Sequence, residues 1–229
     1  MTGPIYHHDI EQGTDAWFAV RCGVLTASEV KDLFTKTGRL ADNDTSKRLV
    51  FEKASQRINK FVEPSFTSFT TQRGHDDEAE AKVVYSNNVT PVEDCGFITN
   101  DEWGFKLGYS PDGLVGQKGL IECKSRLFAL QIKTICEQVV PDEFMAQCQT
   151  GLMVSKRDWL DFISFPAEGG MKMMVLRVEP DFEWQEKIID VAEQFEERVQ
   201  EAMQKYEEAL SNPRIRFFDT ERREELEII

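Results

Sequence analysis

Residues 109–126 read YSPDGLVGQKGLIECKSR, two short apolar runs joined by a glycine-flanked return. Asp112 follows a proline at the head of the predicted hairpin, and Glu122 and Lys124 lie two residues apart on its second strand. Because strand side chains alternate between the two faces of a sheet, Glu122 and Lys124 point the same way and Cys123 points to the opposite, buried face. The short return brings the chain back beside Asp112, so the sequence predicts that an aspartate, a glutamate and a lysine meet at one place.

Two carboxylates and a nearby carbonyl oxygen form a hard oxygen cage, which suits Mg²⁺ or Mn²⁺ rather than zinc. The oxygens would come from Asp112, Glu122 and the backbone carbonyl of Cys123. In phosphodiester hydrolysis such a cation lowers the pKa of water and offsets phosphate charge, while a lysine can position that water or stabilise developing charge. Since Glu-x-Lys is a common pattern, the alternative to a metal site is an ordinary surface hairpin with a Glu–Lys ion pair.

On both sides of this hairpin, the hydrophobic periodicity predicts an α/β chain. We expect a capping box at Thr26–Glu29 to open the first helix, and helices over 27–34, 46–59, 70–85, 128–139, 142–153 and 182–210, with an exposed loop over 36–46. Strands are expected near 92–98, 104–109, 113–116, 119–124, 159–165 and 171–178. This order predicts one α/β sheet with helices on its faces.

The length of 229 residues favours a single domain with a sizeable core. We expect a mainly helical part over 1–90, the sheet core over 91–180, and an acidic helix and tail over 181–229. Apolar residues recur every three or four positions along the last helix, which we interpret as packing on its own domain, with a coiled-coil seam as the alternative. No stretch is apolar enough for a membrane span or a signal peptide, so a cytoplasmic location is expected.

The formal net charge is −14, which taken alone disfavours a nucleic-acid partner. The charge is unevenly distributed, because residues 181–210 hold ten acids against three bases and residues 31–60 hold eight bases against four acids. A basic N-terminal half is compatible with a DNA substrate. Two interpretations are open for the weak DNA-binding candidates: an arch that grips duplex DNA, and a plain solvated loop. These candidates are Lys36, Arg39, Lys47 and Arg48.

Pro111-Asp112 followed by Glu122-Cys123-Lys124 resembles the PD-(D/E)XK nuclease motif. Further blocks occur in the order found in the lambda-exonuclease family of viral recombinases: Trp17 with Arg21, GVLTASEV from Gly23, SPDGL from Ser110, and FMAQCQ from Phe144. The chain therefore resembles that family in patches between Glu11 and Val154. The resemblance implies a restriction-endonuclease-like core, a central mixed sheet flanked by helices.

The resemblance also implies site residues. It implies metal ligands at Asp112, Glu122, the Cys123 carbonyl and Glu78, and catalytic roles for Asp112, Glu122, Lys124 and Gln147. Glu78 is singled out by the family's Gly-x-x-x-Glu spacing after Gly74, although the acids Asp76, Asp77 and Glu80 lie nearby. A solvated helix residue is the alternative for Glu78, and a surface glutamine is the alternative for Gln147.

A pocket for the 5′-phosphate of the degraded strand is implied at Arg21, Ser28 and Ser110. The chemistry agrees, since Arg21 can donate two hydrogen bonds to one phosphate. Ser28 falls in the first turn of a predicted helix, where free N–H groups favour an anion, and Ser110 directly precedes the Pro-Asp pair. An exposed arginine and a second capping serine are the alternatives.

The family resemblance implies a Mg²⁺-dependent 5′→3′ exonuclease, with Mn²⁺ as a substitute, that degrades one strand of duplex DNA from its ends to mononucleotides. Two metal ions at the four ligands would activate water and support the leaving oxygen. It further implies 3′ single-stranded overhangs, a ring-shaped homotrimer, a single-strand annealing protein as partner, and a phage or prophage gene in a bacterial host. Two rivals stay open: an endonuclease of restriction or repair type, and a non-catalytic DNA-binding module.

Overall fold

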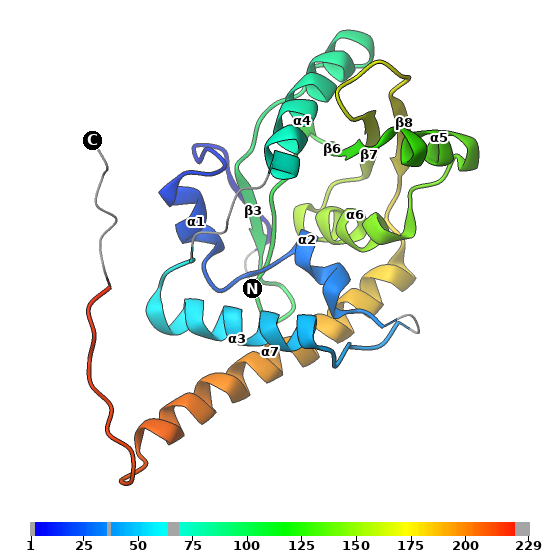
Figure 1. Ribbon diagram of the computed structural model, residues 1–229. Coiled ribbons are helices and arrows are strands. Elements are labelled where there is room, and N and C mark those ends of the chain that lie inside the picture. Colours follow the sequence, from blue (N-terminus) through cyan, green and yellow to red (C-terminus); the bar gives the residue numbers. More distant parts are fainter. Residues whose placement is uncertain (1–2, 36–37, 64–68, 223–229) are drawn as a thin grey trace, which may run out of the picture.

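The computed structural model describes residues 3–35, 38–63 and 69–222 (Figure 1). Its elements are β1 (Ile5–His7), α1 (Asp15–Arg21), β2 (Leu25–Thr26), α2 (Ala27–Val30), the 3₁₀ turn η1 (Lys31–Leu33), α3 (Asp44–Asn59), α4 (Phe69–Asn88), β3 (Phe97–Asn100), β4 (Leu107–Tyr109), β5 (Gly113–Val115), β6 (Gly119–Arg126), α5 (Phe128–Glu137), α6 (Asp142–Ser155), β7 (Trp159–Pro166), β8 (Met174–Val178) and α7 (Phe182–Leu210). The predicted helices are all present: five of the six have ends within three residues of the prediction, and the first, expected over 27–34, is the four-residue α2 continued by the 3₁₀ turn η1.

Helix starts follow the local capping chemistry. The predicted capping box is confirmed, because the Glu29 carboxylate accepts a hydrogen bond from the Thr26 amide at 2.9 Å. Helix α3 begins two residues earlier than predicted, at Asp44, because the side chain of Asn43 caps it by accepting from the Ser46 amide at 2.9 Å. The elements β1, α1 and β2 were missed, since each is too short to show a periodicity.

The strands form two four-stranded sheets and not the single sheet expected, with strand orders β1-β3-β4-β2 and β5-β6-β7-β8. Each sheet is mixed, with one parallel pair, β2 with β4 in the first and β6 with β7 in the second. The chain passes directly from β4 into β5 through Ser110, Pro111 and Asp112. Proline lacks the N–H that a ladder requires, so one sheet ends and the next begins at the predicted site.

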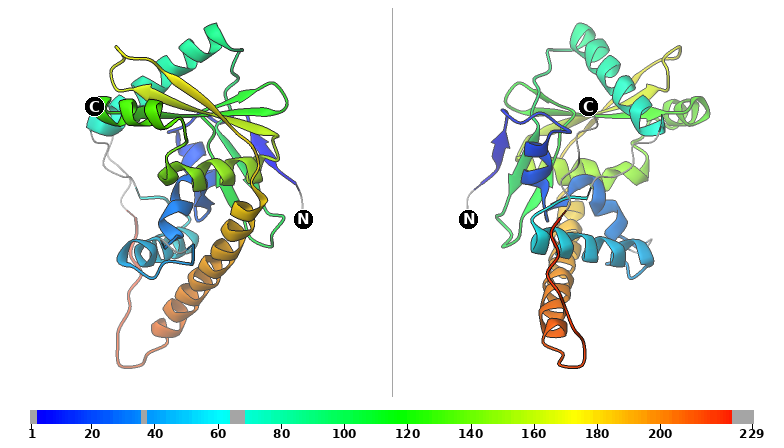
Figure 2. Two further views of the ribbon diagram at one scale, coloured as in Figure 1. Left: turned by 90° about the vertical axis from the view of Figure 1, so that its right-hand side faces the viewer. Right: turned by 60° about the vertical axis from the view of Figure 1, so that its left-hand side comes forward.

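The predicted alternation along β6 is confirmed by its packing. Ile121 and Cys123 belong to a buried cluster with Ala81 and Tyr85 of α4. Leu120 belongs to the main core, which includes residues of α6 and α7. Helices α4 and α6 therefore lie on opposite faces of the β5–β8 sheet, as both views of Figure 2 show. Even-numbered residues of β6 face α6 and odd-numbered residues face α4.

The long helix α7 packs mainly within its own chain. Its residues Ile188, Phe195 and Val199 are buried, and it contacts α3 and α6. Farther along, Tyr206 is 46% exposed, and this end of the helix projects away from the body of the molecule (Figure 2). The intramolecular interpretation is thus confirmed for the first part of the apolar stripe. None of the helices in the described part of the chain is long and apolar enough to cross a lipid bilayer.

Candidate active site

Glu122 is the most constrained acid of the candidate site. Its side chain is 1% exposed at the middle of β6. One carboxylate oxygen, Oε1, accepts from the Gln147 amide at 2.5 Å and pairs with the Lys124 ammonium at 2.7 Å. The other, Oε2, accepts from the Tyr109 hydroxyl at 2.8 Å. The structure therefore brings together three predicted residues, Glu122, Lys124 and Gln147, with a fourth that was not predicted.

Tyr109 is that additional residue, the first of the stretch 109–126. Burial raises the pKa of its hydroxyl well above the ordinary value, and the Glu122 charge raises it further, so the hydroxyl stays a donor. Gly151 of α6 makes room for the ring, because an added Cβ there would lie 2.8 Å from Tyr109 Cζ. The available signal was a tyrosine at the start of the YSPD block, but nothing local indicated that it would reach Glu122.

Replacing Tyr109 by Phe is expected to lower kcat about tenfold with little change in KM. The reason is that Glu122 loses one of its neutral donors, a loss of about 1 kcal/mol or slightly more. The matched control is Tyr85→Phe, which removes another buried hydroxyl, bonded to Asp161 at 2.6 Å on the α4 side of the sheet. Steady-state hydrolysis of linear duplex DNA by both variants checks this, and equal kcat values for the two variants would contradict a positioning role for Tyr109.

Asp112 lies at the junction between β4 and β5, beside the strand that carries Glu122. Its Oδ2 accepts from the Cys123 amide at 2.5 Å, so the Cys123 peptide group is part of the site. Burial raises the pKa of Asp112 well above its usual range, and the charges of Glu122 and Glu78 raise it further, while Lys124 opposes them. Asp112 is thus close enough to acids from both faces of the sheet for their charges to raise its pKa.

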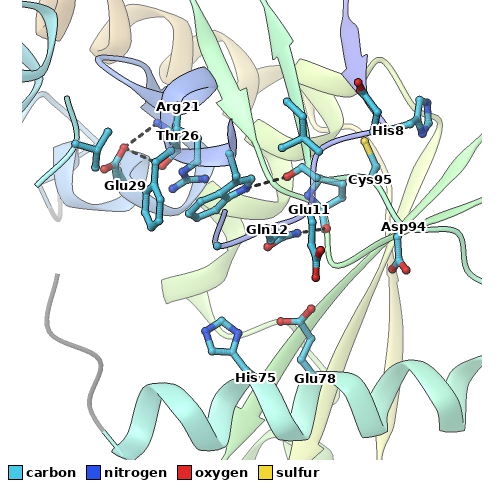
Figure 3. Close-up of a pocket in the computed structure, with 18 of the residues that line it drawn as sticks. His8, Glu11, Gln12, Arg21, Thr26, Glu29, His75, Glu78, Asp94 and Cys95 are labelled. Atoms are coloured by element: carbon cyan, nitrogen blue, oxygen red, sulfur yellow. Dashed lines mark hydrogen bonds between the residues drawn. The ribbon is translucent and has the colours of Figure 1, made fainter. Parts of the chain in front are cut away.

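Glu78 is the acid of α4 that faces the cavity beside this site. Figure 3 shows its carboxylate projecting from α4 toward the segment that carries Glu11 and Gln12. It pairs with Lys82 at 3.1 Å. The neighbouring Asp77 is instead buried, where it accepts from the Ser125 hydroxyl at 2.5 Å and from the Glu168 amide at 3.0 Å. The geometry therefore distinguishes Glu78 from Asp77, as the sequence alone could not.

The predicted set of metal ligands does not converge completely. Within residues 3–35, 38–63 and 69–222, no three His, Cys, Asp or Glu side chains form a group that could hold a metal ion. The physical reason is that Glu122 faces α6, whereas Glu78 comes from α4 on the opposite face and pairs with Lys82. Asp112, Glu122 and the Cys123 peptide remain adjacent. Their oxygens fit a hard divalent cation, since its charge would offset the burial and the neighbouring acids that raise the pKa of Asp112.

Lys124 lies between the carboxylates and is partly exposed. Burial lowers its pKa, but the charges of Glu122 and Asp112 outweigh that effect and raise the pKa above the ordinary lysine value. These carboxylates therefore favour the charged ammonium. The ion pair with Glu122 and the charge of Asp112 favour electrostatic stabilisation or positioning by Lys124 over proton abstraction.

Arg21 and Ser110 are brought together as predicted. The Arg21 guanidinium donates to Ser110 Oγ at 2.9 Å and lies 4.0 Å from the centre of the Trp17 ring. The Trp17 indole N–H also donates to Ser110 Oγ, at 3.2 Å. Arg21, Trp17, Glu78 and Pro111 line a cavity of about 1130 Å³. The cavity thus reaches from the residues predicted to bind the phosphate to the residue before Asp112, and Glu122 is not among the residues that line it.

Ser28 is placed differently from Arg21 and Ser110. It is exposed, its hydroxyl lies 3.3 Å from that of Thr26, and it does not line the cavity. The α-helix that follows Thr26 has only four residues, too short for the anion-binding helix start that was expected. The role of Ser28 therefore depends on the family resemblance alone.

The three weak DNA-binding candidates that the structure describes do not line the cavity. Lys36 lies outside the described residues. Arg39 lines a separate cavity of about 390 Å³ together with residues of α7. Lys47 pairs with Asp42 at 3.3 Å, and Arg48 is exposed on α3. Two other bases of this region are neutralised by ion pairs, Lys53 with Glu29 and Arg57 with Glu196. The described side chains therefore do not form a basic arch at the cavity.

Comparisons with known proteins identify a family and similar solved structures. A family model described as a YqaJ-like viral recombinase domain matches residues 16–158. The alkaline exonuclease LHK-Exo from Laribacter hongkongensis is 28% identical with a TM-score of 0.70, over 86% of this chain and 100% of that chain. The LHK-Exo complex with dAMP gives a TM-score of 0.72 over the same shares. A phage-related exonuclease from Haemophilus somnus 129PT is 18% identical, with a TM-score of 0.49 over 82% of this chain and 95% of that chain. A search of curated proteins found no match.

Proposed function

The chain belongs to the YqaJ-like viral recombinase family, and from that membership we propose that it is a 5′→3′ exonuclease. Its substrate would be duplex DNA, one strand of which it degrades from the end to mononucleotides. The observation that carries the proposal is the buried cluster in which Tyr109, Gln147 and Lys124 all bind the Glu122 carboxylate. Asp112 adjoins this cluster through the Cys123 amide. The structural similarity to an alkaline exonuclease supports the same reaction class.

A divalent cation, Mg²⁺ with Mn²⁺ as a substitute, is part of the proposal. Asp112, Glu122 and the Cys123 carbonyl would hold it, with Glu78 as a further ligand if its carboxylate exchanges Lys82 for the cation. When bound, the ion would offset negative charge on the scissile phosphate. Around it, Tyr109 and Gln147 keep Glu122 in one orientation, and Lys124 presents a positive charge on the same face of β6. These residues form a preorganised electrostatic environment for a phosphodiester.

The polarity of the enzyme would come from Arg21 and Ser110. A terminal 5′-phosphate carries more charge than an internal phosphodiester, and a guanidinium binds such a group through two parallel hydrogen bonds. Arg21 already donates to Ser110 at one end of the cavity, and Pro111 links that position to Asp112. LHK-Exo forms a complex with dAMP, a nucleoside monophosphate, which supports a mononucleotide as the product here.

Assembly and biological context complete the proposal. The remaining 3′ single strand would be coated by a single-strand annealing protein during phage-type recombination in a bacterial cytoplasm, with the exonuclease acting as a homotrimeric ring. Exposed apolar side chains at and beyond the end of α7, including Tyr206, Ile215 and Phe218, are available for contacts between subunits or with such a partner. The acidic charge of α7 would keep this helix away from DNA.

An endonuclease of the same fold is the rival that one experiment separates. Closed circular plasmid and the same plasmid made linear are incubated with the protein and Mg²⁺. We expect the linear form to be degraded and the circle to persist, because a site that holds a terminal phosphate requires a DNA end. Cleavage of the circles at a comparable rate would favour the endonuclease and overturn the proposal.

A further inference from the structure

Arg126 lies on the same face of β6 as the catalytic candidates, although neither its spacing nor the family resemblance assigned it a role. Glu122, Lys124 and Arg126 are two residues apart in sequence, so all three side chains point toward α6. The Phe144 ring of α6 contacts both cations, with Lys124 Nζ 5.5 Å and Arg126 Cζ 5.1 Å from its centre. A second positive charge therefore lies beside Lys124 on one aromatic surface.

The hydrogen-bonding capacity of Arg126 is only partly used. The residue is 7% exposed. Its Nη1 donates to Glu143 Oε1 at 2.6 Å, while its Nε is buried and has no hydrogen-bond partner. An unpaired buried donor on a charged group is costly, and an arginine cannot lower that cost by losing its proton. The protein therefore holds a cation here that its own acceptors leave unsatisfied.

Glu143 is an exchangeable partner rather than a permanent one. Its side chain is 58% exposed at the start of α6, so rotation of the side chain into solvent releases the guanidinium. Because Glu143 is largely solvated, its pair with Arg126 competes poorly with an anion that accepts two hydrogen bonds from the guanidinium. A phosphate oxygen pair fits the planar fork of an arginine and would satisfy more of its donors than Glu143 does.

We propose that Arg126 binds a backbone phosphate of the DNA strand in the active site, and that Glu143 holds the guanidinium until DNA displaces it. The inference rests on the proposed nuclease function and adds a binding residue to that site. It makes two predictions of opposite sign. Removing the arginine weakens DNA binding, whereas removing the carboxylate strengthens it, because DNA no longer has to displace a competitor.

The test measures the affinity for a 5′-phosphorylated linear duplex in Ca²⁺ at several salt concentrations. For Arg126→Gln we expect the affinity to fall about tenfold and the slope of log affinity against log salt to decrease by about 1. For Glu143→Gln we expect the affinity to rise roughly two- to fivefold. In the double variant the gain from Glu143→Gln should disappear.

The matched control is the Lys118–Asp158 pair, with 2.7 Å between its charged atoms, just before the starts of β6 and β7. It lies eight residues from Arg126, roughly 25 Å along an extended strand. Lys118→Gln and Asp158→Asn change the net charge by the same amounts, and we expect neither to alter the salt slope. If Arg126→Gln behaves like Lys118→Gln, or if Glu143→Gln weakens binding, the pair is structural and the inference is wrong.

Two further measurements keep the outcome decisive. Thermal melting shows whether Arg126→Gln is folded. If it is not folded, the surface variant Glu143→Gln decides alone. Tighter DNA binding by Glu143→Gln than by Asp158→Asn supports the inference, and equal or weaker binding overturns it. Digestion of linear duplex by the unmodified protein in Mg²⁺ tests the proposed function separately. A protein that digests and binds DNA, but shows no change in salt slope for Arg126→Gln, would retain the proposed function and lose only the role of Arg126.

Discussion

Lys124→Ala is expected to slow hydrolysis of linear duplex DNA about a thousandfold while the protein still binds that DNA in Ca²⁺. The ammonium lies 2.7 Å from Glu122 and on the same face of β6, so its removal takes away the nearest positive charge from the scissile phosphate. The side chain is partly exposed, and its loss leaves no large cavity in the core. Rates from single-turnover digestion and affinities from the Ca²⁺ complex check the two halves of this expectation.

Lys124→Arg separates the two roles that the lysine can play. An arginine keeps the positive charge but cannot accept a proton near neutral pH, so a purely electrostatic role predicts partial activity and a base role predicts none. The ion pair with Glu122 and the charge of Asp112, which raise the pKa of Lys124, favour partial activity. Full activity of Lys124→Ala would remove the lysine from the mechanism. An unmodified protein that binds DNA but digests nothing would instead favour the non-catalytic module.

Removing the 5′-phosphate from a linear duplex is expected to slow digestion by about 10- to 100-fold, the effect of one or two lost charge-assisted hydrogen bonds. Arg21→Ala should remove the difference between phosphorylated and hydroxyl ends. The guanidinium is oriented by Ser110 and by the Trp17 ring, so it is preorganised for a ligand at the cavity wall. Initial rates on the two kinds of end, for both proteins, measure the effect.

Arg39→Ala provides the control for the loss of an arginine. Arg39 is exposed and lines the separate cavity against α7, so its variant should retain the preference for phosphorylated ends. If it also slowed digestion of both ends equally, the weak assignment of Arg39 to DNA binding would gain support. Equal rates on both ends with the unmodified protein would remove the 5′-phosphate assignment from Arg21 and Ser110.

The parts of this site that sequence could predict depend on local geometry. Alternation along one strand placed Glu122 and Lys124 on one face and Cys123 on the other, and the packing of β6 confirms it. The proline before Asp112 marked a break in the chain, although not that the break separates two sheets, because strand pairing depends on distant residues.

What sequence could not predict depends on contacts between distant segments. Tyr109 reaches Glu122 only because Gly151, in a helix far along the chain, leaves space for its ring. Glu78 was named from a family spacing, but its separation from Glu122 by the β5–β8 sheet and its ion pair with Lys82 needed coordinates. At Ser28 the local prediction was correct but its consequence was not. The capping box is present, but the α-helix that it begins has only four residues.

The central claim is tested most directly by a linear duplex labelled at one end, digested in Mg²⁺. With the label on the 5′-terminal nucleotide, the account predicts immediate release of a labelled mononucleotide. With the label at the 3′ end of the same strand, the label is expected to stay in polynucleotide while the 5′ label is released. Early release of the 3′ label, or labelled oligonucleotides as the first product from the 5′ label, would contradict a 5′→3′ exonuclease.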